Sequence, residues 1–336
     1  MVAPTAHRED REPVTAPPED RPFPPGRSEL ESLGLPGPAA PPTSPLAFPD
    51  GGAWRLEIPS VEGPEALAEV IRTAGRLEVP VHRVSQGSGV GMLRDVEIGD
   101  MVQAAEENGI DLCLFVRPGA DWDTGASAGT TGSVSARSRG SAQLQAGIAQ
   151  ARRAAALGVR SLLVSDEGLL WSLHRLRERG DLPARTRFKV SVMAAPANPA
   201  AFRVQGLLGA DTVNVPSDLT IHQLAELRAA GPAAIDFYVE SPDNVGGFVR
   251  HHEIAEVVRV SAPVYVKFGL RNARGVYPAG EHLAAEVLAA TRERVRRARL
   301  GLDELERHSA VRAASPVGSH SLAAAERFPG PPPAAP

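Results

Sequence analysis

The sequence predicts an α/β protein, a single (β/α)8 barrel of the TIM type, because two kinds of segment alternate along its central part. Short runs rich in β-branched and aromatic residues recur at regular intervals, and stretches rich in Ala, Leu, Glu and Arg with helical apolar spacing lie between them. Successive strand–helix units favour parallel strands joined by helical crossovers, and eight such units close naturally into a barrel. An open, doubly wound sheet is the alternative.

Eight strands are expected, in chain order. They cover residues 54–60, 79–85, 111–117, 159–165, 187–193, 210–216, 234–240 and 262–268. In several of them polar and apolar residues alternate, so that one set of side chains faces the barrel interior and the other packs under the helices. Asp236, Tyr238 and Glu240 form one such set, and Tyr265 and Lys267 form another.

The helical pattern is clearest over residues 63–77, 96–109, 141–158 and 218–231. Ala66, Val70 and Leu77 recur at helical spacing in the first of these stretches. In the last, Asp218 is the expected N-cap and Gly231 the expected end.

The barrel is expected over residues 50–308, between two tails of residues 1–48 and 309–336. Both tails are rich in proline or alanine and lack apolar periodicity, which predicts disorder. One connection, residues 118–140, is long and rich in Gly, Ser, Thr and Ala. Because it would leave the carboxyl end of a barrel strand, two interpretations stay open, a substrate lid and a flexible connection.

Composition limits the classes of function. A net charge of −4 favours neither nucleic acid nor an anionic membrane as a partner. The sequence has no apolar run of membrane-spanning length, and its start lacks the apolar core of a signal peptide, so we expect a soluble cytoplasmic protein. The single cysteine, Cys113, cannot form an intrachain disulfide or a four-cysteine cluster and is expected to be buried. A homo-oligomer stays open.

Lysine is rare in this chain, and its two occurrences are informative. Among 36 basic residues only Lys189 and Lys267 are lysines, and both lie in predicted strands. Only lysine can lose its proton or form an imine, so a lysine kept where arginine is the rule points to chemistry. Lys189 is expected near the opposite mouth of the barrel, in a structural role.

Polar residues gather where the predicted strands end. Candidates for catalysis are Lys267, Glu240, Asp166 and Glu57, and candidates for substrate binding are His82, Arg117, Asn214, Tyr238 and Arg271. Glu240 on the adjacent strand is the expected partner of Lys267, because a charge inside a barrel must be paired. A purely structural Glu–Lys pair is the alternative.

Two ligand sites are also open. Glu57, Asp166 or Glu240 with His82 could hold a divalent metal ion, although no spacing requires one. Gly246 and Gly247, with Arg271 and Arg274, could bind the anionic group of a ligand, because barrels often bind phosphate after strands seven and eight. An ordinary Gly-rich turn is the alternative. The adjacent His251 and His252 are expected at the surface or in a helix cap.

Three segments, "HRVSQGSGV", "LGADTVNVPSDLTIHQLAEL" and "YVESPDNVGGFVRHHEIAEVVRVSAPVYVKFGLRN", resemble the actinobacterial barrel proteins described as U32-family peptidase-like. The resemblance covers about residues 54–305 and implies a (β/α)8 barrel and a peptidase activity. Some members of that superfamily hold an iron–sulfur cluster on four cysteines. A chain with only Cys113 lacks those ligands.

Three functions follow as hypotheses. The first is a lyase- or hydrolase-type barrel enzyme that acts on a small anionic organic substrate without a tightly bound redox cofactor. Lys267 would act there as acid/base or imine-forming group, tuned by Glu240. The second is a peptidase, as the resemblance implies. The third is a non-catalytic barrel that binds a ligand or a partner subunit.

Overall fold

The computed structural model describes residues 40–117, 137–308 and 312–322, and it confirms the predicted barrel. Its strands all pair in parallel, in chain order, and β8 closes the ring against β1. The strands are β1 (Trp54–Pro59), β2 (Arg83–Ser85), β3 (Asp111–Phe115), β4 (Ser161–Val164), β5 (Arg187–Val190), β6 (Thr212–Asn214), β7 (Ala234–Glu240) and β8 (Val264–Phe268). Each of the eight strands lies within its expected range.

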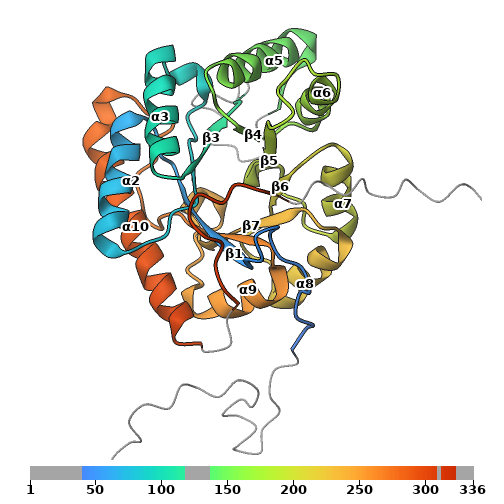
Figure 1. Cartoon of the computed structure of the whole chain (residues 1–336), viewed down its shortest axis with the longest axis vertical. Helices are drawn as coiled ribbons and strands as arrows, with labels where there is room; N and C mark the ends of the chain where they lie inside the picture. The colour runs from blue at the N-terminus through green and yellow to red at the C-terminus, as the bar shows by residue number, and fades with distance from the viewer. Residues whose placement is uncertain (1–39, 118–136, 309–311, 323–336) are drawn as a thin grey trace, which may run out of the picture.

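The helices form the outer layer around the ring of strands (Figure 1). They are α2 (Pro64–Leu77), α3 (Asp95–Glu107), α5 (Gly140–Ala156), α6 (Glu167–Glu178), α7 (Pro199–Leu207), α8 (Ile221–Ala230), α9 (Ile254–Ser261) and α10 (Ala284–Glu306). Short 3₁₀ turns, η1 (Val90–Met92), η2 (Val192–Ala194), η3 (Asp243–Val245), η4 (His251–Glu253) and η5 (Glu281–Leu283), complete the connections.

Helix α8 shows how local chemistry sets a boundary. Its N-cap is Thr220, not the expected Asp218, because the Thr220 hydroxyl accepts from the N–H of Gln223 while the Gln223 side chain accepts from the N–H of Thr220. This reciprocal pair satisfies two N–H groups that the first helical turn leaves unbonded. The predicted end at Gly231 is confirmed.

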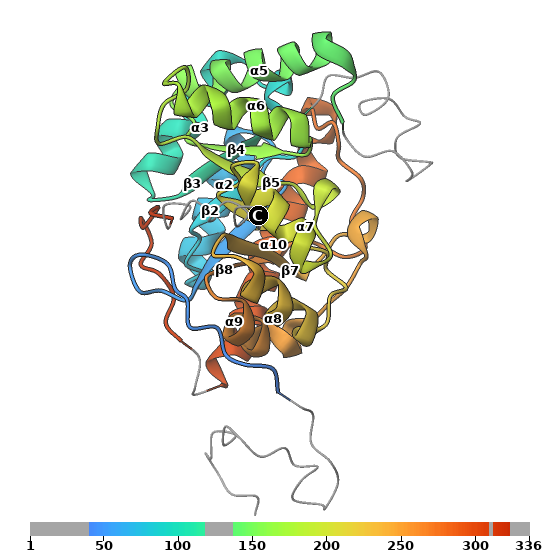
Figure 2. The ribbon, with the colours of Figure 1, turned by 90° about the vertical axis from the view of Figure 1, so that its right-hand side faces the viewer.

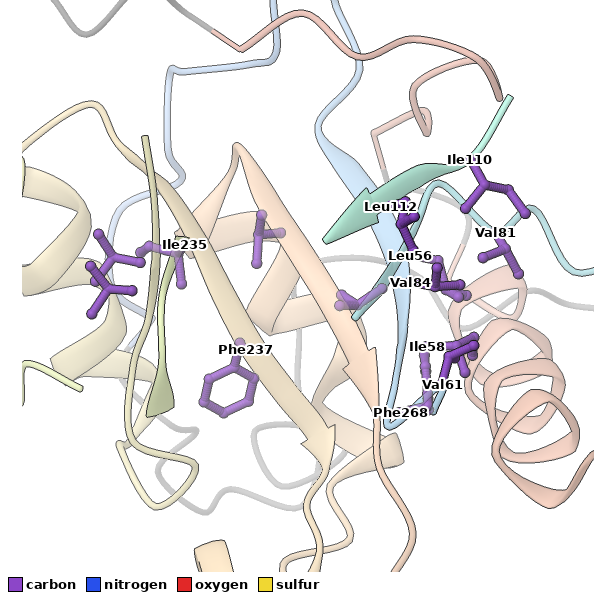
Figure 3. Close-up of a cluster of buried hydrophobic side chains, with 14 of the residues drawn as sticks. Leu56, Ile58, Val61, Val81, Val84, Ile110, Leu112, Ile235, Phe237 and Phe268 are labelled. Carbon is purple, nitrogen blue, oxygen red and sulfur yellow. The ribbon is translucent and has the colours of Figure 1, made fainter. Parts of the chain in front are cut away.

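The apolar core lies between the strands and the helices. Leu56, Ile58, Val84 and Phe237 are fully buried on the outward faces of their strands, and Figure 3 shows part of this cluster. Helix α10 packs closely because it has a glycine, Gly301, at its contact with β8. A Cβ there would lie 2.4 Å from the ring of Phe268.

Parts of both supposed tails are ordered and cover the amino-terminal mouth of the barrel, contrary to expectation. Residues 312–322 lie across the ring of strands in Figure 1 and beside the segment that leads into β1 in Figure 2. Ser315 accepts from Arg55 Nε at 3.0 Å, and the backbone of Ser321 accepts from the same guanidinium at 2.8 Å. Phe48 is buried against Arg55 and Tyr265. The composition of the tails concealed these contacts, since they depend on a few polar atoms and one aromatic ring.

Strand β7 contains an irregularity that affects the site. Its register against β8 shifts between Tyr238 and Glu240, as in a β-bulge. A bulge reverses the facing of the residues that follow it. Asp236 and Tyr238 precede the shift and point into the barrel as expected. Glu240 follows it and faces the other way.

Candidate functional site

The barrel interior holds an unusual density of charge centred on Glu57. Both lysines of the chain contact this carboxylate: Lys189 bonds both of its oxygens, and Lys267 Nζ lies 3.5 Å from Oε1. Arg83 donates to Oε2 at 2.6 Å and Ser85 donates to Oε1 at 2.6 Å. All these side chains are almost fully buried.

The carboxylate is held ionised. Burial alone would raise the pKa of Glu57, but the charges of Arg83, Lys189 and Lys267 outweigh it and hold the pKa well below its usual range. Burial and the neighbouring Arg83 lower the pKa of Lys189, against the opposing pull of Glu57. Glu57 is thus the fixed anion of the interior.

Positive charge exceeds negative charge in this cluster when every group is ionised. Three cations, Arg83, Lys189 and Lys267, face two carboxylates, Glu57 and Asp236, the second of which also pairs with Arg83. The Oδ2 atom of Asp236 is buried and has no hydrogen-bond partner among the described residues. An uncompensated buried charge is costly, so the cluster favours an anionic ligand or the neutral form of one amine.

Among the charged residues of the cluster, Lys267 is the one that lines a cavity. Its Nζ donates to Asn214 Oδ1 at 2.5 Å and lies 4.0 Å from the centre of the Tyr238 ring. Asn214 is oriented by its own bond to the backbone oxygen of Val190, at 2.5 Å. The amine therefore has a defined position at the cavity floor.

The cavity has a volume of about 1150 Å³ and opens at the carboxyl ends of the strands, the usual active-site face of this fold. Four of the predicted site residues line it: Arg117, Asn214, Tyr238 and Lys267. Glu57 lies directly beneath, in contact with Lys267. The structure thus brings five of the nine predicted residues together.

The expected pair of Lys267 with Glu240 is wrong. Glu240 accepts from the Nε2 of His251 at 3.0 Å and from the backbone N–H of Arg271 at 3.1 Å, and Arg297 of α10 lies 3.6 Å away. The register shift in β7 turns Glu240 toward these outer elements. The pKa of Glu240 is lowered, because its hydrogen bonds and the Arg297 charge outweigh burial.

Three further candidates lie away from the cavity lining. Asp166 caps α6, accepting from the N–H of Leu169 at 2.7 Å. His82 lies at the amino-terminal end, where its Nδ1 accepts from the N–H of Leu56 and its Nε2 bonds the backbone oxygen of Ser315. Arg271 pairs with Asp243 at 2.6 Å.

The positions of these residues do not form the expected metal site or the expected anion site. His82, Asp166 and Glu240 lie in three different places, and the described residues contain no group of three His, Cys, Asp or Glu side chains that could hold a metal ion. Arg271 and Arg274 pair with Asp243 and Glu286, and neither lines the cavity. The Lys267 end, not the Arg271 end, is where the structure offers a ligand positive charge.

Lys189 pairs with Glu57, as its expected structural role implies, but it lies in mid-barrel and not near the opposite mouth. The rarity of lysine in the sequence marks Lys189 and Lys267 equally. Four residues of the cavity mouth were not predicted: Ser60, Met193, Phe248 and Tyr277. These four residues lie on the connections that follow strands, where no periodic pattern predicts the direction of a side chain. Cys113 is buried as expected, and burial raises its pKa to about 12.

Comparison with known proteins assigns no family to this chain. No family model matches the chain, and no curated protein matches it. Solved structures that match include a U32 peptidase at 15% identity, covering 57% of this chain and 70% of that one, with a TM-score of 0.37. A putative copper homeostasis protein CutC from Streptococcus agalactiae matches at 13% identity over 63% and 98% of the two chains (TM-score 0.42).

A putative phosphonomutase from Burkholderia cenocepacia matches at 14% identity over 72% and 95%, with a TM-score of 0.43. These proteins have different functions by their names, and all the similarities lie at low identity and TM-scores below 0.5. No helix in the described part of the chain is long and apolar enough to cross a membrane.

Proposed function

We propose that this barrel is an enzyme that binds a small anionic carbonyl compound, such as an oxo acid, and forms an imine with it through Lys267. The observation that carries the proposal is the position of the Lys267 amine at the floor of the cavity, between Asn214 and Tyr238. It supports a reactive amine because the nitrogen is both oriented and accessible from the cavity.

The charge of the cluster supports an anionic substrate. Glu57 and Asp236 together cannot neutralise three cations, and Lys189 and Arg83 already occupy the oxygens of Glu57. A carboxylate bound beside Lys267 would supply the missing negative charge. Asn214, Ser85 and Tyr238 offer neutral polar atoms around the same point.

Once the anionic substrate is bound beside the Lys267 ammonium, the ammonium gives one proton to the solvent of the cavity. The neutral amine then attacks the carbonyl carbon and forms a C–N bond. Its two hydrogens pass to the carbonyl oxygen, which leaves as one molecule of water, and the nitrogen of the new C=N bond takes back a proton from the solvent. The resulting imine acts as an electron sink for cleavage or proton transfer at the neighbouring carbon. No redox cofactor takes part in this step.

Borohydride trapping tests the proposal with unusual clarity, because the chain has only two lysines. The protein would be incubated with pyruvate or glyoxylate, reduced with borohydride, digested and analysed by mass spectrometry. We expect the added mass on the peptide that contains Lys267, with none on the peptide that contains Lys189.

The controls are Lys267→Met and Lys267→Arg, which remove the titratable amine, and an incubation without a carbonyl compound. Both variants should remain folded by circular dichroism and lose the adduct. An adduct at Lys189 or at the chain terminus alone, or no adduct across a panel of oxo acids, would overturn imine formation. A stable, fully labelled Lys267→Arg protein would do the same.

A further inference from the structure

The two sides of the cavity mouth differ in chemistry. On the side of β2 to β4 the lining includes Gln86, Arg117, Arg137 and Glu167, which are polar or charged. On the side of β5 to β7 it is formed largely by apolar side chains. These include Val192, Met193, Pro196, Pro216, Val245 and Phe248.

Two large apolar side chains on the second side are left uncovered by the described residues. Met193 is 40% exposed and Phe248 is 39% exposed, and both line the cavity. A ligand that covers apolar side chains at the mouth of a cavity binds more tightly, because apolar surface is removed from water. The amine at the floor and these side chains at the rim would contact different parts of one ligand.

The segments that carry the two residues are held by hydrogen bonds. The N–H of Phe248 donates to Ser241 Oγ at 2.8 Å, and the N–H of Ser241 donates to the backbone oxygen of Phe248 at 2.9 Å. Met193 lies in η2, where its N–H donates to Ser191 Oγ at 3.3 Å. A backbone fixed in this way loses little conformational entropy when a ligand binds.

We infer that the substrate is amphipathic: an anionic carbonyl head at Lys267 followed by an unbranched or lightly branched apolar chain that lies against Met193 and Phe248. This inference rests on the proposed function for the position of the head. It adds the chemical class of the remainder of the molecule, a medium-chain oxo acid.

Calorimetric titration with saturated carboxylates of two to eight carbons tests the inference without requiring imine formation, because these ligands have no reactive carbonyl. For the wild-type protein we expect the dissociation constant to fall by about fourfold for each added methylene until the chain leaves the wall. In the double variant Met193→Ser/Phe248→Ser this dependence on chain length should largely disappear, while acetate binds as in the wild type.

Leu207→Ser is the matched control. Leu207 is exposed to a similar extent on α7 but does not line the cavity, so the wild-type dependence on chain length should remain. A flat series in the wild type, or an unchanged slope in the double variant, would overturn the inference.

The two proposals fail in different ways. If carboxylates bind more tightly with chain length but no borohydride adduct forms, imine formation is wrong and the amphipathic ligand is supported. If an adduct forms at Lys267 but chain length has no effect on binding, imine formation is supported and the apolar chain is wrong.

Discussion

At the residue scale, Glu57 organises the interior, although the sequence predicts Glu240 as the partner of Lys267. The sequence marked Glu57 and both lysines as notable, because each is polar within a strand pattern or rare in the chain. It could not show which carboxylate meets which amine. That depends on the register of β7 against β8, and one shifted residue turned Glu240 away.

Removing the charge of Glu57 should be strongly destabilising, because Arg83, Lys189 and Lys267 would then face one carboxylate. For Glu57→Gln we expect the free energy of unfolding to fall by about 3–5 kcal/mol in urea titrations. The double variant Glu57→Gln/Lys189→Met removes one cation as well, and should recover part of this loss.

Glu293→Gln serves as the control, since Glu293 makes half-exposed ion pairs on α10 whose loss should cost under about 1 kcal/mol. If Glu57→Gln were no more harmful than the control, the interior charges would be less tightly coupled than the distances indicate. Additive losses in the double variant would lead to the same conclusion.

At the element scale, patterns of period two and of helical period predicted each strand and the clearest helices. They failed where an element depends on a few specific contacts. Residues 40–48 and 312–322 have no periodicity, yet Ser44 bonds the backbone of Ala262 at 2.5 Å and Ser315 bonds Arg55. Single hydrogen bonds to a distant strand leave no pattern in the sequence.

The segment 312–322 should therefore contribute to stability. Truncation after residue 308 would remove two acceptors of the buried Arg55, the Ser315 hydroxyl and the Ser321 backbone oxygen, leaving Asp50 and Tyr265 as partners. Because a hydrogen bond to a charged group is worth about 1.5–3 kcal/mol, we expect a loss of at least about 2 kcal/mol and a clearly lower Tm.

Truncation after residue 322 is the matched control, because it keeps every described contact of the segment. Its Tm should stay within about 1 °C of the full chain, since it removes none of those hydrogen bonds. Equal stability of the two truncated proteins would show that the contacts with Arg55 contribute little.

At the scale of the whole molecule, the barrel has two ends with different tasks. The carboxyl ends of the strands surround the cavity, and the amino-terminal mouth is covered by residues 40–50 and 312–322. The sequence predicted the site at the carboxyl ends, because the polar residues that end each strand can be read from that strand alone. It could not predict the cover, which joins segments from the two ends of the chain.

His82 links the cover to the barrel and should make the stability of the whole molecule depend on pH. It bonds the N–H of Leu56 through Nδ1 and the backbone oxygen of Ser315 through Nε2, so the neutral ring, with its proton on Nε2, satisfies both partners. Burial lowers the pKa of His82 to about 4 in the folded protein. In the unfolded chain the imidazole returns to its usual pKa of about 6.5.

The unfolded state therefore binds a proton more readily, and acid favours unfolding. The lowered pKa of His82 contributes about 3 kcal/mol to the free energy of unfolding above about pH 6.5. This contribution is lost as the pH falls from 6.5 toward 4. Free energies of unfolding measured by urea titration at several pH values should show this slope in the wild type.

His82→Gln keeps one amide donor for Ser315 but cannot be protonated, so its profile should be flatter between pH 6.5 and 4.5, even though the variant is less stable at pH 7. The half-buried His174 and His320, whose pKa values burial also lowers, contribute equally to both proteins and cancel in the difference. Parallel profiles would mean that the ring takes up a proton in the folded protein without breaking the link between β1, β2 and the carboxyl-terminal segment.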